Sequence, residues 1–498
     1  MRGYEKVAKF LAEKGADTKR PFFDPQVYVE GMLFEMAKPD EPGVAVLVSR
    51  NGKVLFSKGY GLANLPDKLP VTSDTKFRIG SVTKQFTAAA ILKLQEEGKL
   101  KVTDKLNKFI SDYPRGDEVT LHHLLTHTSG ITSYTSKPDF YESVTKPIKP
   151  EDLIASFKQD KFDFDPGEKW SYNNSGYFLL GYIVKKVSGK SYGDYLTESF
   201  FKPLGMNSTG LHAAKLDLKT EAKGYSYGDG KFDDALNWDM SRAGGAGAIY
   251  STVGDLHLWN EGIFGGKLLK QESLDAAFTK AETNDGDSSA GYGYGWMMTE
   301  QRGLKTISHN GGLHGFVSNL TRFPDQQLTI AVLHNAMPST GALQPDRIAP
   351  LVAEIYLWQE MKPRPRLEVD EDVDPKSYVE LAGRYDYGPA VMIVTTEDNR
   401  IFAQLTGQPK HEIYPASPTK YFWKVVEAEI EVLRDEADKV VAVQHTQGGR
   451  TFKAPRLKDE ASVKLSEEVL DSFTGTFEFP AIGKLVVTRK DDHLRLKK

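Results

Sequence analysis

A serine followed three residues later by a lysine, in RIGSVTKQFTAAAILKLQEEGKL, has the clearest potential for chemistry in this chain. The hydroxyl of Ser81 is a potential nucleophile, and the amine of Lys84, when neutral, is a potential base for its proton. The run after Ser81 has no Gly or Pro until Gly98 and has a largely apolar face with helical spacing. We therefore expect a helix beginning at or just before Ser81, with the two side chains one turn apart on the same face. The positive end of the helix dipole would favour a developing oxyanion there.

Other copies of the Ser-x-x-Lys spacing lack this setting. The tetrapeptide SVTK recurs at Ser143, but Pro147 directly follows its lysine and disfavours helix at that residue. The remaining copies lie in a turn-like stretch, near a helix end and across a proline, and they begin at Ser73, Ser199 and Ser417 respectively. Only Ser81 has the expected helical setting.

Two further motifs follow in chain order, Tyr172-Asn173-Asn174 and His309-Asn310-Gly311. Tyr172 is a candidate to pass a proton to the leaving group as a general acid, or to serve as the base itself. Asn174 is a candidate to hold both the lysine and the substrate amide by hydrogen bonds. Together with Ser81 and Lys84, these residue types are sufficient for acyl transfer through a serine.

Acyl transfer also needs an oxyanion hole, which is best made from two backbone N–H groups that are fixed before the reaction. The N–H of Ser81 at the helix start is the first. The stretch HNGGLHGF has small residues that allow a strand backbone to approach a substrate closely, and we assign the second N–H to Gly312.

The order and context of these motifs resemble the serine hydrolase family that contains class C β-lactamases, D-alanyl-D-alanine carboxypeptidases, D-aminopeptidases and related esterases. Further family-like stretches are LLTHTSGI, PGEKWSYNNSGY, AGGAGAIYSTVGDL and GYGYGW. The resemblance extends from PGVAVLV to the helix that ends near Trp358. It implies a penicillin-binding-protein-like enzyme with Ser81, Lys84 and Tyr172 as catalytic residues. The substrate-binding residues that it implies are Asn174, His309 and Gly311.

One departure from the family pattern bears on the substrate. β-Lactamases of this family usually carry Lys-Thr-Gly on the strand where this chain has His309-Asn310-Gly311, so the lysine that attracts a substrate carboxylate is missing. This resembles the peptidase and esterase branches. We therefore expect a peptidase or amidase of the D-aminopeptidase or D-Ala-D-Ala carboxypeptidase type. His314, where a small residue or proline is expected, would narrow or polarise the site.

The alternatives within the family are a carboxylesterase and a weak β-lactamase. From another class, the chain could serve as an inactive penicillin-binding-like scaffold module. The presence of Lys84, Tyr172 and Asn174 together argues against that reading, because a scaffold has no need of all three.

The expected fold class is α+β. The hairpin signal around Asn51-Gly52 and the strand patterns that return from about residue 290 predict an antiparallel sheet built from both ends of a domain, with helical material inserted between. The expected organisation is an N-terminal helical extension (1–29), a β-lactamase-like domain (30–360), a linker (361–377) and a C-terminal β-barrel-like domain (378–498).

The C-terminal region resembles the small, lipocalin-like barrels appended to D-aminopeptidases of this family. It also contains an internal repeat, because Gly383–Tyr387 matches Gly475–Phe479. Two explanations are open for the second copy. Its strands complete the barrel of the first copy, or the chain has been shortened.

Composition excludes several classes of function. The net charge of −4 gives no general attraction to nucleic acid, no apolar run is long enough to cross a membrane, and the absence of cysteine excludes thiolate catalysis. His123 and His127 have the spacing of zinc ligands, but Leu124 stands where a zincin glutamate would be, so we expect no metal and no cofactor. The first residues lack the apolar stretch and cleavage site of a secretory signal, so we expect a cytoplasmic protein, or an extracytoplasmic one if a leader was removed. The expected partners are a small peptide, amide or ester substrate and, through the added domain, further copies of the chain.

Overall fold

A computed structural model describes the chain from residue 24 to residue 497, except for several short segments. The described ranges are 24–211, 220–228, 230–288, 290–337, 343–363, 367–388, 390–426, 428–435, 437–447, 450–458, 467–479, 483–490 and 493–497. The chain divides into two compact units, residues 1–362 and 363–498. Most of the predicted N-terminal extension lies outside the described residues, and the first described helix is α2 (Pro25–Met36).

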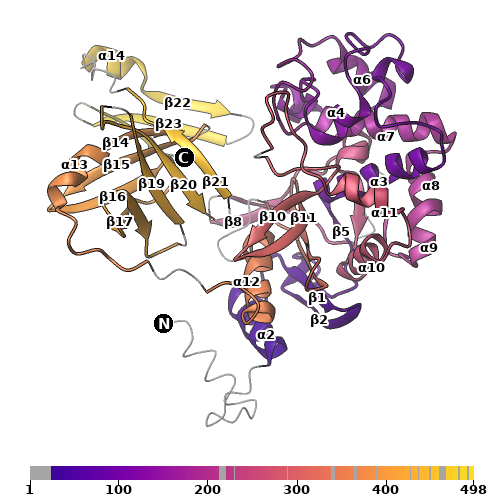
Figure 1. Ribbon diagram of the computed structural model, residues 1–498, viewed down its shortest axis with the longest axis horizontal. Helices are drawn as coiled ribbons and strands as arrows, with labels where there is room; N and C mark the ends of the chain where they lie inside the picture. Colours follow the sequence, from indigo (N-terminus) through magenta and orange to yellow (C-terminus); the bar gives the residue numbers. More distant parts are fainter. Residues whose placement is uncertain are drawn as a thin grey trace. The chain divides into compact units, whose positions relative to one another are not determined.

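The first unit is built on a six-stranded antiparallel sheet with the strand order β10-β11-β12-β13-β1-β2 (Figure 1). The strands are β1 (Val44–Arg50), β2 (Lys53–Tyr60), β10 (Met297–Gln301), β11 (Leu304–Leu313), β12 (Phe316–Phe323) and β13 (Leu328–His334). Strand β1 pairs with both β2 and β13, so the sheet joins the two ends of the unit, as the sequence predicts. Asn51 and Gly52 form the hairpin turn with φ angles of 52° and 75°.

Strand β1 is buried on both faces, and its alternating side chains belong to two different cores. Val44, Val46 and Val48 pack in the core that includes residues of α2 and of α12 (Pro345–Leu357). Ala45 and Leu47 pack in the larger core on the other face, where the inserted helices lie. Figure 1 shows α2 and α12 together on one side of the sheet. The confirmed α+β class follows from this two-sided burial.

The inserted region carries the helices that position the candidate site. The principal ones are α3 (Thr83–Glu96), α4 (Leu121–Thr126), α7 (Asn174–Ser188) and α10 (Val253–Phe264). The shorter helices are α5 (Phe140–Ser143), α6 (Pro150–Lys158), α8 (Tyr192–Leu196), α9 (Lys202–Leu204) and α11 (Gln271–Ala277). Small sheets pair β3 (Leu62–Asn64) with β4 (Leu69–Pro70), β9 (Ile249–Ser251) with both β5 (Phe77–Arg78) and β6 (Gly210–Leu211), and β7 (Tyr225–Gly228) with β8 (Lys231–Asp234).

The second unit contains an eight-stranded antiparallel sheet in simple sequence order. Its strands are β14 (Gly383–Asp386), β15 (Val391–Glu397), β16 (Arg400–Leu405), β17 (His411–Pro415), β18 (Lys420–Trp423), β19 (Ala428–Arg434), β20 (Val440–Gln447) and β21 (Arg450–Pro455). A bridge between Tyr385 and Arg456 and a hydrogen bond from the N–H of Leu457 to the carbonyl of Arg384 bring the first and last strands together. The sheet is therefore a nearly closed barrel.

The last three strands lie outside this barrel. Strands β22 (Gly475–Phe479), β23 (Gly483–Lys490) and β24 (His493–Lys497) form a separate three-stranded sheet. The explanation that the second repeat completes the first barrel is therefore wrong, because β14 already meets β21. The two copies begin alike, since a short helix, α13 (Tyr378–Leu381) or α14 (Glu467–Ser472), precedes the first strand of each.

Among the described residues, no helix is both long and apolar enough to cross a membrane.

Candidate active site

Ser81 lies where strand β5 turns into helix α3. A single 3-10 turn, η1 (Gly80–Val82), carries Ser81, and the α-helix proper begins at Thr83. Gly80 adopts a left-handed φ of 49°, which allows this sharp change of direction. The serine hydroxyl is consequently at the N-terminal end of a buried 14-residue helix, as the sequence predicts.

The amine of Lys84 is fully buried and contacts three oxygen atoms. Its Nζ lies 3.0 Å from Ser81 Oγ, 2.8 Å from Asn174 Oδ1 and 2.9 Å from the carbonyl oxygen of Ala246. Burial lowers the pKa of Lys84 well below its usual value. A neutral amine has two N–H groups and one lone pair. It can therefore donate to the two carbonyl-type oxygens and accept the hydroxyl proton of Ser81.

The carbonyl of Ala246 reaches Lys84 because the glycine-rich segment before it packs tightly on helix α7. A Cβ atom placed on Gly245 would lie 2.5 Å from the carbonyl oxygen of Tyr177, and one on Gly181 would lie 2.9 Å from the Cα of Gly245. Glycine at these positions is required for the approach. The AGGAGA stretch thus supplies a backbone acceptor to the site.

Tyr172 lies across the amine of Lys84, whose Nζ is 4.7 Å from the centre of the phenol ring. The residue as a whole is 38% exposed, but its hydroxyl faces Ser81. Burial raises the pKa of Tyr172, and the nearby hydroxyl of Ser81 acts in the opposite direction without cancelling the rise. The phenol is therefore protonated, which suits a proton donor better than a base.

Asn174 is the first residue of helix α7, and Asn173 caps that helix. While the Oδ1 of Asn174 accepts from Lys84, its Nδ2 donates to Thr135 Oγ1 at 2.9 Å. The structure therefore brings Asn174 to the lysine as expected. Its second polar atom contacts Thr135, so a contact with a substrate amide would have to replace that bond.

His127 holds the segment that carries Tyr172. Its carbonyl oxygen accepts the N–H of Ser171 at 3.0 Å, and its Nδ1 accepts the N–H of Asn173, also at 3.0 Å. Its ring centre lies 4.4 Å from that of Tyr172. The carbonyl oxygen and Nδ1 of His127 thus accept hydrogen bonds from the N–H groups of Ser171 and Asn173. N–H groups two residues apart point to the same side of an extended strand. His127 therefore replaces a pairing strand along residues 171–173.

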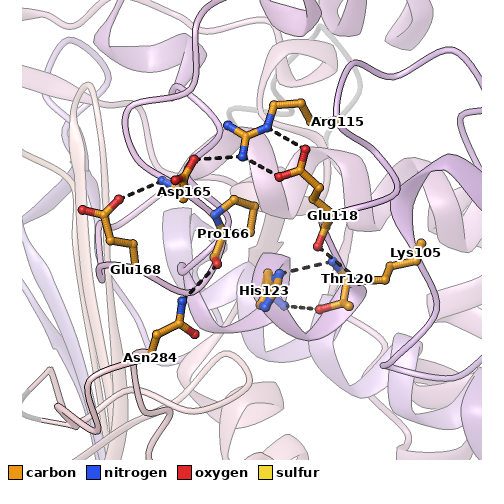
Figure 2. Close-up of polar contacts among 9 residues, drawn as sticks. All are labelled: Lys105, Arg115, Glu118, Thr120, His123, Asp165, Pro166, Glu168 and Asn284. Carbon is orange, nitrogen blue, oxygen red and sulfur yellow. Dashed lines mark hydrogen bonds and ion pairs between the residues drawn. The ribbon is translucent and has the colours of Figure 1, made fainter.

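The chain leading to this segment is also held from outside, as Figure 2 shows. Arg115 donates to Glu118 and to Asp165, at 2.9 and 2.8 Å, and the backbone N–H of Asp165 donates to Glu168. Asn284 donates to the carbonyl of Pro166 on the same loop. Exposed ion pairs of this kind contribute little stability individually. Their effect is to fix the path of the loop that precedes Tyr172.

His309 lies behind Tyr172 on strand β11 and is only 1% exposed. Its Nδ1 donates to the carbonyl of Asn310 at 2.6 Å, so the neutral ring accepts at Nε2 from the hydroxyl of Tyr292 at 2.9 Å. Burial, with a contribution from Lys84, lowers the pKa of His309 to about 3. The sequence predicts a substrate contact for His309. This geometry favours a role in positioning Tyr172 and Tyr292.

Gly311 and Gly312 bring strand β11 against the serine turn. A Cβ atom on Gly311 would lie 2.0 Å from the carbonyl oxygen of Ile79, so no side chain fits there. A Cβ atom on Gly80 would lie 2.9 Å from the backbone nitrogen of Gly312. The two backbones that are predicted to form the oxyanion hole, at Ser81 and Gly312, are therefore adjacent.

His314 follows at the end of this strand and belongs to an aromatic cluster. Trp238 donates a hydrogen bond from its indole nitrogen to His314 Nδ1, and Tyr141 packs against the imidazole with ring centres 5.3 Å apart. Burial lowers the pKa of His314, which keeps the ring neutral. The cluster joins the segments of the inserted region that carry Tyr141 and Trp238 to the end of strand β11.

Sequence reasoning missed three contributors to the site. The Ala246 carbonyl has no side-chain signal, although AGGAGA is part of the family-like context. Tyr292 belongs to GYGYGW, which reads as strand and turn glycines, and His127 reads as part of a structural helix and turn. Only the tertiary contacts show that Ala246 contacts Lys84, that Tyr292 contacts His309 and that His127 positions Tyr172.

A serine beside a buried lysine at the start of a helix, in a domain whose antiparallel sheet has helices on both faces, is the arrangement of a serine hydrolase. The chain belongs to the Beta-lactamase family, whose sequence model matches residues 34–354. Penicillin-binding protein 4* of Bacillus subtilis (strain 168) is 29% identical over 415 residues, which span 79% of this chain and 91% of that protein.

Solved structures agree with this membership. An octameric penicillin-binding protein homologue from Pyrococcus abyssi matches 86% of this chain and 99% of its own, with 26% identity and a TM-score of 0.60. A D-stereospecific amidohydrolase from Streptomyces sp. matches 65% of this chain and 97% of its own, with 27% identity and a TM-score of 0.56.

Proposed function

We propose that the protein hydrolyses amide bonds in small peptides or amides, with a preference for D-residues, through an acyl-enzyme on Ser81. The observation that carries this proposal is the neutral, buried His309 on the strand where β-lactamases of the family usually carry a lysine. Without a charge at that position, an uncharged amide is a better substrate than a molecule with a carboxylate. This favours the D-aminopeptidase or amidase type over the D-Ala-D-Ala carboxypeptidase type. Similarity to a D-stereospecific amidohydrolase supports the same choice.

In the proposed acylation, Lys84 Nζ takes the hydroxyl proton of Ser81 as Oγ attacks the substrate carbonyl carbon. The carbonyl π electrons move to oxygen, and the N–H groups of Ser81 and Gly312 stabilise the oxyanion. The intermediate collapses and its C–N bond breaks. The leaving amine receives the proton from Lys84 through the hydroxyl of Tyr172, which gives up its own proton and regains the one on the lysine.

In deacylation, a water molecule attacks the Ser81 ester and loses its proton to Lys84 through Tyr172. The ester C–O bond then breaks, Ser81 recovers its proton from Lys84, and the acid product leaves. The same two groups act in both halves of the cycle, since Tyr172 donates in the first and accepts in the second.

The cluster of Tyr141, Trp238 and His314 is the proposed binding surface for the substrate side chain. It lies at the end of strand β11, two residues beyond Gly312, and Trp238 also contacts Arg78, three residues before Ser81. Neutral aromatic walls suit an apolar side chain. They provide no carboxylate to pair with a basic one.

A carboxylesterase or a weak β-lactamase would use the same acylation steps, so kinetics must separate them. We therefore propose comparing D-alanyl and L-alanyl p-nitroanilide, N-acetyl-D-alanyl-D-alanine, p-nitrophenyl acetate and nitrocefin, with Ser81→Ala as the control. The proposal predicts a kcat/KM for the D-anilide at least about tenfold above that for the L-anilide, a discrimination of about 1.4 kcal/mol. Turnover of the acetate ester without either anilide would establish the esterase instead. Rapid nitrocefin turnover would establish the β-lactamase.

The inactive scaffold is disfavoured by the intact contacts of Lys84 with Ser81 and Asn174. A scaffold would show no Ser81-dependent turnover of any of these compounds.

We also propose that the protein forms a homo-oligomer. The support is the octameric state named for the Pyrococcus abyssi homologue, which this chain matches over most of its length. Light scattering coupled to size-exclusion chromatography tests it. A mass equal to one 55.5 kDa chain at micromolar concentration would contradict it.

A further inference from the structure

The interior of the C-terminal barrel is filled at one end and hollow at the other. Residues directly opposite one another on paired strands share a face of the sheet, so the register identifies the inward positions. Buried side chains such as Tyr385, Ile401 and Ile430 fill one part of the interior. Further along the same strands lies a cavity of about 340 Å³. We call it the barrel-mouth cavity and define it by Tyr387, Met392, Ala403, Leu405, Trp423 and His445.

The register shows that this cavity is inside the barrel. Met392 pairs with both Tyr385 and Leu405, and His445 pairs with the buried Ile430. Phe452 pairs with His445 on the next strand, yet 43% of Phe452 is exposed. The side chain of Phe452 therefore points into the barrel but is accessible to solvent, as expected where the barrel interior contains an unfilled cavity.

Four of the six defining residues, Met392, Ala403, Leu405 and Trp423, give the cavity an apolar wall, and the polar side chains that line it are those of Tyr387, His445, Gln408, His411 and Gln447. The hydroxyl of Tyr387 lies 3.0 Å from Nδ1 of His445 and 3.2 Å from the sulfur of Met392. His445 is 7% exposed, and burial lowers its pKa, so the ring is neutral. When Nδ1 of the neutral ring accepts the hydrogen bond from the Tyr387 hydroxyl, Nε2 carries the ring N–H. Its one described partner, Gln447 Oε1, lies at a long 3.4 Å. A closer acceptor atom in the cavity would accept a stronger hydrogen bond from the Nε2–H of His445.

We propose that the barrel-mouth cavity binds one small, predominantly apolar molecule that carries a single hydrogen-bond acceptor. At the roughly 30 Å³ that a water molecule occupies in the liquid, the space holds about a dozen non-hydrogen atoms. Trp423, Leu405 and Ala403 contact the apolar body, and His445 Nε2 donates to the acceptor. A flat protein surface would not reach His445, because the ring lies inside the barrel and is nearly fully buried.

The test uses the full chain and the fluorescence of 1-naphthylamine, which has 11 non-hydrogen atoms. Two competitors of ten non-hydrogen atoms each are compared, octanamide with an acceptor and butylbenzene without one. We expect saturable binding of the fluorophore and its displacement by octanamide at roughly 0.1 mM or below. The absence of a saturable signal would overturn the proposal.

Variants locate the site. Ala403→Phe fills the cavity and is expected to weaken all three compounds at least about tenfold. Ile393→Phe adds the same ring on the outer face of the neighbouring strand, where Ile393 is 42% exposed, and should change nothing. His445→Phe keeps the stacking on Phe452 but removes the donor, so octanamide should weaken about fivefold and butylbenzene less than twofold.

If Ala403→Phe loses its near-ultraviolet circular dichroism, the smaller Ala403→Val replaces it and should weaken binding in proportion. Unchanged affinity in a folded Ala403 variant, or equal losses for the two competitors in His445→Phe, would contradict the proposal.

Discussion

The carbonyl oxygen of Ala246 accepts a hydrogen bond from Lys84 Nζ at 2.9 Å, although 162 residues separate the two. With Asn174 Oδ1 as the second acceptor, both N–H groups of a neutral lysine amine are used. The remaining lone pair is then directed to the hydroxyl of Ser81. The backbone of a glycine-rich loop thus helps to decide which atom of the lysine faces the nucleophile.

The buried, neutral state of Lys84 predicts how stability depends on pH. In the unfolded chain this lysine binds a proton below about pH 10.5, whereas in the folded chain it does so only below its lowered pKa. Between these two values the unfolded state binds more protons, so folding becomes more favourable as the pH rises. Relative to Lys84→Met, the wild type should gain about 1.4 kcal/mol in free energy of unfolding per pH unit.

Urea unfolding of both proteins at pH 7.5, 8.5 and 9.5 measures this difference. A difference that does not change with pH would mean that Lys84 is charged in the folded protein and is not the base.

The same shift predicts the pH profile of acylation. The rate should fall toward acid as Lys84 becomes protonated, and Lys84→Arg should be inactive at every pH because a guanidinium does not lose its proton in this range. His309 is neutral above about pH 3, so it cannot produce this limb. In His309→Gln we expect a lower rate with an unchanged midpoint. If the fall in rate toward low pH shifts or disappears in His309→Gln, the titrating group is His309 and not Lys84.

His127→Phe should slow acylation about tenfold to a hundredfold, because the ring remains but the acceptor for the Asn173 N–H is lost and Tyr172 shifts. His127→Asn should recover much of the rate. Asparagine tolerates the left-handed φ of 64° at this position and offers an acceptor at a similar place. Stopped-flow acylation with a chromogenic ester measures both, and thermal melting serves as the control for folding. Equal rates for the two variants at equal stability would refute the positioning role.

Gly311→Ala should lower acylation about a hundredfold, since its Cβ would lie 2.0 Å from the Ile79 carbonyl and would push Gly312 away from the serine turn. Gly228→Ala is the matched control, because a Cβ at that position has open space around it. Acylation rates of both variants at one substrate concentration are sufficient. Near-normal activity of Gly311→Ala would show that acylation tolerates a shift of strand β11. It would contradict the assignment of the Gly312 N–H to the oxyanion hole.

Local chemistry made much of the site predictable. The Ser81–Lys84 spacing specifies one turn of helix, and the structure forms that turn with Nζ 3.0 Å from Oγ. The Asn51-Gly52 signal likewise predicts the hairpin that it forms. In both cases the information lies within a few residues of the feature.

Features that depend on distant contacts could not be predicted in this way. The burial of His309 follows from Tyr292 and Tyr172 packing around it, and the role of His127 follows from its position beside residues 171–173. The place of β22–β24 depends on the meeting of β14 and β21, because a barrel closed by its own strands has no edge for a further copy.

The most direct test of the central claim is intact-mass spectrometry of the wild type, Ser81→Ala and Lys84→Met after brief mixing with D-alanyl p-nitrophenyl ester. We expect a D-alanyl adduct on the wild type that forms and then clears, no adduct on Ser81→Ala, and slow or absent labelling of Lys84→Met. An adduct of equal yield on Ser81→Ala, or rapid labelling of Lys84→Met, would show that Ser81 is not the nucleophile or that Lys84 is not its base.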